Sequence, residues 1–165
     1  MNQSDTSLDS TDLALLQLLQ TDATPSNQAL AESAGVSPAT ALRRVKRLWD
    51  AGLIERQVAV LSANRLGAAL GHGLTAIVEV SLDHQATERL AAFEARAVAE
   101  AAVQQCYRVS PGPDFCLVVT VADMPAYQAL SERLFTADAN VRNVKAFFST
   151  HRAKFESKLP LPLTV

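Results

Sequence analysis

The spacing of apolar residues changes along the chain from a helical repeat to a strict alternation. Before residue 60, apolar side chains recur every three or four positions, which predicts helices over residues 12–20, 27–34 and 38–51. Ser26 and Ser37 stand where a hydroxyl caps a helix N-terminus, and Gly52 stands where a left-handed glycine ends one. A short helix, a tight turn at Gly35 and a serine-capped third helix form a helix-turn-helix pattern.

The third predicted helix has an apolar side and a cationic side. Five apolar positions are expected to face inward: Ala41, Leu42, Val45, Leu48 and Trp49. Four polar positions fall at i, i+3, i+4 and i+7 and are expected to share an outward face: Thr40, Arg43, Arg44 and Arg47. Residues 54–61 then read as a strand, and residues 62–73 as a glycine-containing linker.

Beyond the linker, the apolar positions alternate. Four strands are predicted, over residues 74–82, 103–109, 115–122 and 144–152. One helix is predicted over residues 87–101, and Asp123 caps another. The resulting order is βαββαβ, which is the ferredoxin-like arrangement. The expected fold is therefore α+β, with an N-terminal helix-turn-helix (winged-helix-like) domain and a C-terminal ferredoxin-like domain.

Composition narrows the functional classes. A hydrophobic fraction of 48% supports packed cores. Residues 1–6 are polar and have no basic residue, and no apolar run could cross a bilayer, so we expect a cytoplasmic protein without a membrane partner. Cys106 and Cys116 are expected to be buried small side chains, and the histidines stand alone. We expect no metal, no cofactor and no catalytic residues.

Charge is concentrated on one segment of the chain. Residues 37–57 carry a net charge of +3, while the whole chain carries −2. A cationic face on an acidic body favours nucleic acid as a partner, because it attracts phosphates locally. The alternative is that these basic residues form an ordinary solvent-exposed helix face. The neighbouring helix-turn-helix pattern makes this the weaker interpretation.

Residues 8–67 contain an extended set of motif positions: Leu8-Asp9, Asp12, Leu16, Leu19-Gln20, Ser26, Leu30-Ala31, Val36-Ser37-Pro38, Arg43-Arg44-Val45, Arg47-Leu48 and Gly52-Leu53-Ile54. In these positions the segment resembles the N-terminal half of the Lrp/AsnC family of transcription regulators. This resemblance implies that the helix starting at Ser37 enters the major groove of double-stranded DNA. The DNA-contact candidates are Ser37, Thr40, Arg43, Arg44, Lys46 and Arg47. Of these, Thr40 and Arg43 are best placed for bases, and Arg44, Lys46 and Arg47 suit phosphates.

The same resemblance implies that the second half binds a small-molecule effector such as an amino acid and forms homo-oligomers. A dimer, and further a tetramer or octamer, would read a pseudo-palindromic operator. The family carries a Gly-x-x-Asp loop between its second and third strands. Here Asp114 occupies the aspartate position, while Pro111 replaces the glycine and Gly112 is displaced by one. The candidate effector residues are Gly112, Asp114, Tyr107 and Thr150; the alternative is a plain hairpin in which Asp114 bonds to its own backbone.

The predicted domains are residues 1–60, a linker over 61–73, a sensor domain over 74–152 and a tail over 153–165. The predicted function is a one-component, sequence-specific transcription regulator. One alternative is an architectural DNA-binding protein of low specificity. Another is an enzyme resembling siroheme decarboxylases, which is weaker because "AVLSANRLG" has no histidine before His72.

Overall fold

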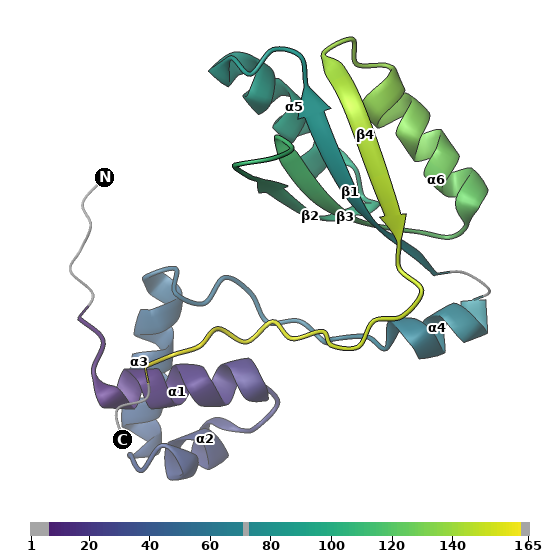
Figure 1. Ribbon diagram of the computed structural model, residues 1–165. Coiled ribbons are helices and arrows are strands. Elements are labelled where there is room, and N and C mark those ends of the chain that lie inside the picture. Colours follow the sequence, from purple (N-terminus) through teal and green to yellow (C-terminus); the bar gives the residue numbers. More distant parts are fainter. Residues whose placement is uncertain (1–6, 71–72, 163–165) are drawn as a thin grey trace. The chain divides into compact units, whose positions relative to one another are not determined.

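The computed structural model describes residues 7–70 and 73–162 (Figure 1). Contacts divide the chain into two compact units. The first unit, the reader, comprises the residues up to Val60 and the tail from Lys154 onward. The second unit, the sensor, spans Leu61–Ala153. The tail therefore belongs to the first unit although it follows the second in sequence.

Three helices form the reader: α1 (Ser10–Thr21), α2 (Asn27–Ser33) and α3 (Pro38–Asp50). The predicted caps are confirmed. The hydroxyls of Ser26 and Ser37 accept backbone N–H bonds of 3.3 Å and 3.2 Å, respectively. Gly52 takes a φ of +70°, which disfavours residues with a side chain and ends α3. Local sequence therefore determines where these helices begin and end.

A small apolar core joins the three helices. Its buried members are Leu15, Leu30, Ala31, Ala41 and Leu48. The prediction that Leu42 and Trp49 also face this core is wrong, since 61% of Leu42 and 38% of Trp49 are exposed. Successive helix residues are rotated by about 100° around the helix axis. The buried stripe is centred on Ala41 and Leu48, so Leu42 and Trp49, each one residue further on, lie at the side of this stripe.

The segment after α3 departs from the prediction. Residues 54–62 carry no strand pairing, and Val58, Val60 and Leu61 are exposed. A strand requires a neighbour to accept its backbone hydrogen bonds, and the described residues of this chain provide none. The predicted linker instead contains a helix, α4 (Ala63–Leu70), whose alanines and leucines favour helix over loop.

The sensor contains a four-stranded antiparallel sheet: β1 (Leu74–Leu82), β2 (Val103–Arg108), β3 (Phe115–Val121) and β4 (Val141–Phe148). The strand order is β2-β3-β1-β4. Besides α4, the sensor has the helices α5 (Thr87–Ala99) and α6 (Met124–Ser131), and α6 continues into a π-helical turn over Glu132–Thr136. The βαββαβ prediction is confirmed, although β4 begins and ends earlier than residues 144–152.

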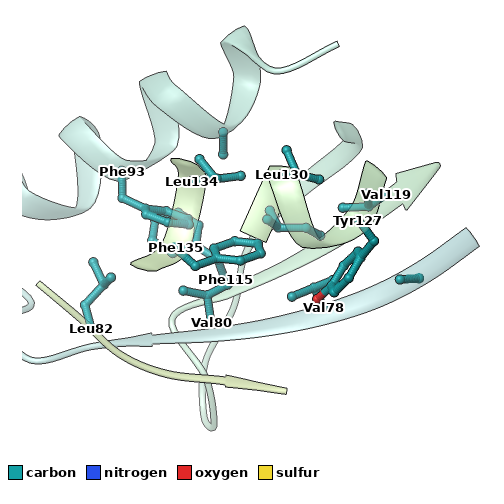
Figure 2. Packing of buried hydrophobic residues seen from close by; sticks show 13 residues of the cluster. Val78, Val80, Leu82, Phe93, Phe115, Val119, Tyr127, Leu130, Leu134 and Phe135 are labelled. Carbon is teal, nitrogen blue, oxygen red and sulfur yellow. The ribbon is translucent and has the colours of Figure 1, made fainter. Parts of the chain in front are cut away.

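The helices α5 and α6 cover one face of the sheet, and the core lies between these helices and that face (Figure 2). Val78 and Val80 of β1 project into it, as the period-two pattern predicts. Phe93 packs against Phe115 with ring centroids 4.8 Å apart. The opposite face of the sheet has no covering element among the described residues of this unit.

Each helix of the described residues is too short or too polar to span a bilayer. No group of His, Cys, Asp and Glu side chains within residues 7–70 and 73–162 is arranged to hold a metal ion.

Candidate DNA-binding face and effector loop

An ion-pair network joins the first and third helices of the reader. Nη1 of Arg44 lies 2.7 Å from Oδ2 of Asp9 and 2.9 Å from Oδ1 of Asp12. Arg47 also pairs with the carboxylate of Asp12. Asp12 is fully buried, and a buried charge requires partners of this kind. We call Asp9, Asp12, Arg44 and Arg47 the α1–α3 network.

The network lowers the pKa values of its two carboxyl groups. Burial alone would raise the pKa of Asp12, but hydrogen bonds from Arg47, the Asp9 backbone and Arg44 outweigh it and lower the pKa. The pKa of Asp9 is lowered first by the Asp12 backbone N–H and then by Arg44. Both groups are therefore carboxylates at neutral pH, and they hold the arginines toward α1.

This pairing changes which side chains of α3 face outward. Arg44 is half-buried, and its Nε is buried without a hydrogen-bond partner among the described residues, so its guanidinium points inward. The exposed stripe instead runs at i, i+3, i+4 and i+7 through Ala39, Leu42, Arg43 and Lys46. We call these four residues the outward stripe. It lies one position away from the stripe that the sequence predicts.

The two cations of the outward stripe differ from those of the network. Neither Arg43 nor Lys46 has an ion pair or hydrogen bond with any residue that the structure describes. Their charges are therefore available to a partner. Arg47 is intermediate, because its side chain is 47% exposed although one nitrogen contacts Asp12.

The two hydroxyl candidates lie at the first turn of α3. Oγ of Ser37 lies 2.9 Å from Oγ1 of Thr40 and accepts the Thr40 backbone N–H. Both hydroxyls are thus engaged with each other, and Ser37 is needed to cap the helix. Asn27 supports the same turn by donating to the carbonyl of Pro38 at 2.9 Å.

In the sequence Asp9 and Asp12 only mark the family resemblance, and their contact with α3 is not predicted. A signal for it was present. Two acids three residues apart at a helix start can form a capping box, and here each side chain accepts the backbone N–H of the other. The four basic residues of α3, which packs on α1 in the same core, are natural partners for such a carboxylate.

The loop between β2 and β3 places Asp114 against the central strand of the sheet. Oδ2 of Asp114 accepts the backbone N–H of Leu82 at 2.6 Å, and its own N–H donates to the carbonyl of Val80 at 2.9 Å. Neither is the local turn bond of the plain-hairpin alternative, because both partners lie on β1. Gly112 has a φ of +125° at the tip of this loop, a conformation that favours glycine.

The other two effector candidates are separated in this chain. Tyr107 is exposed and pairs in register with Cys116, near the same loop. Thr150 follows β4 at the other end of the sheet, since the neighbouring Ser149 N–H donates to Thr75. Thr75 and Leu82 are seven residues apart on one strand, or about 20 Å. One chain therefore does not bring Thr150 to Asp114.

Comparison with known proteins agrees with this two-part architecture. Residues 8–55 match the model for winged helix-turn-helix DNA-binding domains, and residues 75–159 match the Lrp/AsnC ligand binding domain. The two domains together define a transcriptional regulator that joins a DNA-binding reader to a ligand-binding domain. The chain belongs to the Lrp/AsnC family.

Relatives of known class cover nearly the whole chain. The leucine-responsive regulatory protein of Rhizobium meliloti is 35% identical over 89% of this chain and 92% of its own. The Bkd operon transcriptional regulator of Pseudomonas aeruginosa is 34% identical over 93% and 98%, respectively.

Two solved structures share the fold. An AsnC family transcriptional regulator from Agrobacterium tumefaciens is 28% identical, with a TM-score of 0.84 over 96% of this chain and 100% of that chain. A transcriptional regulator from Neisseria meningitidis, solved in complex with L-Met, is 30% identical. Its TM-score is 0.80 over 94% of this chain and 98% of that chain.

Proposed function

We propose that the regulator reads its operator through the outward stripe of α3, with Arg43 contacting bases and Lys46 contacting a phosphate. The observation that carries this proposal is the contrast between two pairs of cations. Arg44 and Arg47 pair with acids on α1, whereas Arg43 and Lys46 pair with no acid among the described residues. Arg43 lies in the second turn of the helix, where an arginine can bond the O6 and N7 of guanine.

Arg44 and Arg47 take other roles in this proposal. Arg44 positions α3 against α1 and does not contact DNA, because both its acid partners hold it inward. Arg47 keeps part of its guanidinium exposed and reaches a phosphate at the edge of the groove. Ser37 and Thr40 present their hydroxyl pair and the N-terminus of α3 to the backbone, where a helix N-terminus favours a phosphate.

The regulator acts as a homo-oligomer in this proposal. The uncovered face of the sheet presents Ile77 and Phe147, which are register partners and are 46% and 53% exposed. Tyr107 extends this apolar surface at the edge strand. A second copy would bury these side chains. A two-fold dimer would then present two α3 helices to a pseudo-palindromic operator, and further association would give a tetramer or octamer.

An amino acid is the proposed effector. The Neisseria relative was solved with L-Met. In this chain Asp114 stands on the loop between β2 and β3, where the family resemblance places the effector loop. Its Oδ1 has no hydrogen bond among the described residues and suits an α-ammonium group. Gly112 and Tyr107 lie near it. Thr150 would contribute from another protomer, because its own chain places it at the far end of the sheet.

Fluorescence-anisotropy binding tests the reading of DNA. The protein is titrated against the DNA upstream of its own coding sequence and against a scrambled duplex, over a salt series. A large preference for the upstream DNA, reduced in Arg43→Ala, is expected. Equal affinity for both duplexes at every salt concentration would instead support the architectural alternative. The absence of binding at low salt would contradict any role in DNA recognition.

Calorimetry tests the effector. The twenty common amino acids are titrated into the protein, and binding is confirmed by thermal stabilisation. Heat from one of them, lost in Asp114→Ala, is expected. A screen with neither heat nor stabilisation would remove the amino-acid proposal and leave the reading of DNA unaffected.

A further inference from the structure

Leu42 is an apolar side chain set inside the cationic outward stripe. It is 61% exposed and takes no part in the reader's core. A single exposed leucine is ordinary on a protein surface. This one, however, lies on the second turn of α3, three residues after the exposed Ala39 and directly before Arg43. The first half of α3 thus presents an exposed apolar pair beside one arginine.

The major groove offers one apolar group to such a pair. Only thymine displays a C5 methyl there, and side-chain hydrocarbon contacts discriminate it from cytosine, which lacks the methyl and presents an amino donor. An arginine beside that contact recognises guanine through O6 and N7. Adjacent residues of the outward stripe are therefore suited to two different bases, Leu42 to thymine and Arg43 to guanine.

The surrounding charges favour DNA over a second copy of this chain as the occupant. Arg43 and Lys46 border Leu42, and no acid of the described residues pairs with them. Docking two such stripes against each other would bring like charges together. A polyanion whose groove contains methyl groups satisfies both the cations and the leucine.

We infer that Leu42, supported by Ala39, is a specificity-determining residue that contacts a thymine C5 methyl, in each half-site, next to a guanine contacted by Arg43. This inference rests on the proposed reading of DNA through α3 and adds the identity of one base and the atom that is read. It predicts an operator whose half-site contains a thymine and a guanine at neighbouring base pairs.

The test removes the methyl alone. Operator sequences are first selected by the full-length protein from a random duplex pool. The thymine of each half-site is then replaced by deoxyuridine, which keeps every hydrogen-bonding group and lacks only the methyl. A thymine outside the selected consensus is replaced in a control duplex. Affinities are measured for the wild type, Leu42→Ala and Leu159→Ala, the last removing an exposed leucine of the tail.

For the wild type, deoxyuridine in the half-site is expected to weaken binding about fourfold per methyl, and the control duplex is expected to bind normally. Leu159→Ala should show the same loss. Leu42→Ala should bind thymine and deoxyuridine duplexes equally, while keeping the wild-type affinity for scrambled DNA, which shows that it is folded.

Three results would overturn the inference. The first is an equal deoxyuridine penalty in the wild type and Leu42→Ala, which would assign the methyl to another residue. The second is a selected consensus without thymine, or a consensus insensitive to deoxyuridine; either would leave the proposed reading of DNA standing. The third is a pool that yields no consensus, which would overturn the proposed sequence-specific reading as well.

Discussion

Nη1 of Arg44 lies 2.9 Å from Oδ1 of Asp12, a carboxylate that is buried between the first and third helices of the reader. The contact ties the DNA-facing helix to the helix behind it. It also draws Arg44 away from the exposed surface of α3. Asp12 therefore helps to decide which residues of α3 form the outward stripe, together with the sequence of α3 itself.

Replacing Asp12 by alanine is expected to destabilise the reader by about 3 kcal/mol, because it leaves Arg47 and part of Arg44 without a buried partner. Trp49, the one tryptophan of the chain, lies on α3, so its fluorescence during urea unfolding reports this unit. Asp50→Asn, which alters an exposed carboxylate on the same helix, serves as the control and should change stability by less than about 0.5 kcal/mol. Equal stability of the two variants would contradict a structural role for Asp12.

Acid should weaken the reader through the same carboxylates. The pKa values of Asp9 and Asp12 are lowered in the folded chain, so their stabilisation is fully present above the unfolded value of about 3.9. It is lost as the pH falls through the lower folded-state pKa values. The urea midpoint, monitored by tryptophan fluorescence, should therefore decrease as the pH is lowered below 4. The decrease should be steeper in the wild type than in Asp12→Asn. Parallel curves would show that the network contributes nothing to the acid response.

Arg43→Ala should impair DNA binding, whereas Arg44→Ala should impair the stability of the reader. Loss of Arg43 is expected to reduce affinity for the preferred duplex about 10- to 100-fold and to leave stability unchanged, because Arg43 has no described partner. Loss of Arg44 is expected to lower the urea midpoint of the reader. Lys46→Ala, a phosphate-contact control, should weaken all duplexes alike and reduce the salt slope by about 1. A stable Arg44→Ala protein with the binding defect expected of Arg43→Ala would reverse these assignments.

Asp114 has a structural role in the sensor in addition to its proposed role in effector binding. Asp114→Ala removes the acceptor of the Leu82 backbone N–H, and we expect it to destabilise the sensor by about 1–3 kcal/mol. Asp114→Asn keeps an acceptor oxygen but loses the charge. It should retain stability in calorimetric unfolding while losing affinity for an ammonium-bearing ligand. Unchanged ligand affinity in Asp114→Asn would place the effector elsewhere.

The uncovered sheet face should determine assembly. Ile77→Asp places a charge where Ile77 and Phe147 would be buried by a second copy, and a smaller species is expected in sedimentation velocity. Val98→Asp is the matched control, since Val98 is exposed on α5, a helix of the opposite face. Dissociation of Val98→Asp but not of Ile77→Asp would move the interface to the helical face.

Features with a local cause could be predicted from the sequence. The serines at positions 26 and 37 cap their helices, Gly52 ends α3, and Asp123 accepts the N–H of Ala126 at 2.9 Å to begin α6. The alternation over residues 74–82 likewise gives β1 its buried face. Each of these features depends on side chains within a few residues of the backbone that they organise.

Features that depend on a distant partner could not be predicted in this way. The face that α3 turns outward depends on Asp12, more than thirty residues away, which draws in Arg44. Residues 54–61 have the composition of a strand but no neighbouring strand in the described chain. Thr150 is predicted to join Asp114 in the effector site, whereas the antiparallel register of β4 places Thr150 at the other end of the sheet.

The tail makes the reader discontinuous in sequence. The amide of Gln20 on α1 donates to the carbonyl of Leu159 at 3.0 Å and accepts its N–H at 2.9 Å. The sensor is thus an insertion between two pieces of one folding unit, joined to it by a covalent connection at each end. A fragment that stops at Val60 would lack one of those pieces. A conformational change in the sensor can therefore be transmitted to the reader through two covalent connections. One is the segment after α3, and the other is the tail, which bonds to α1.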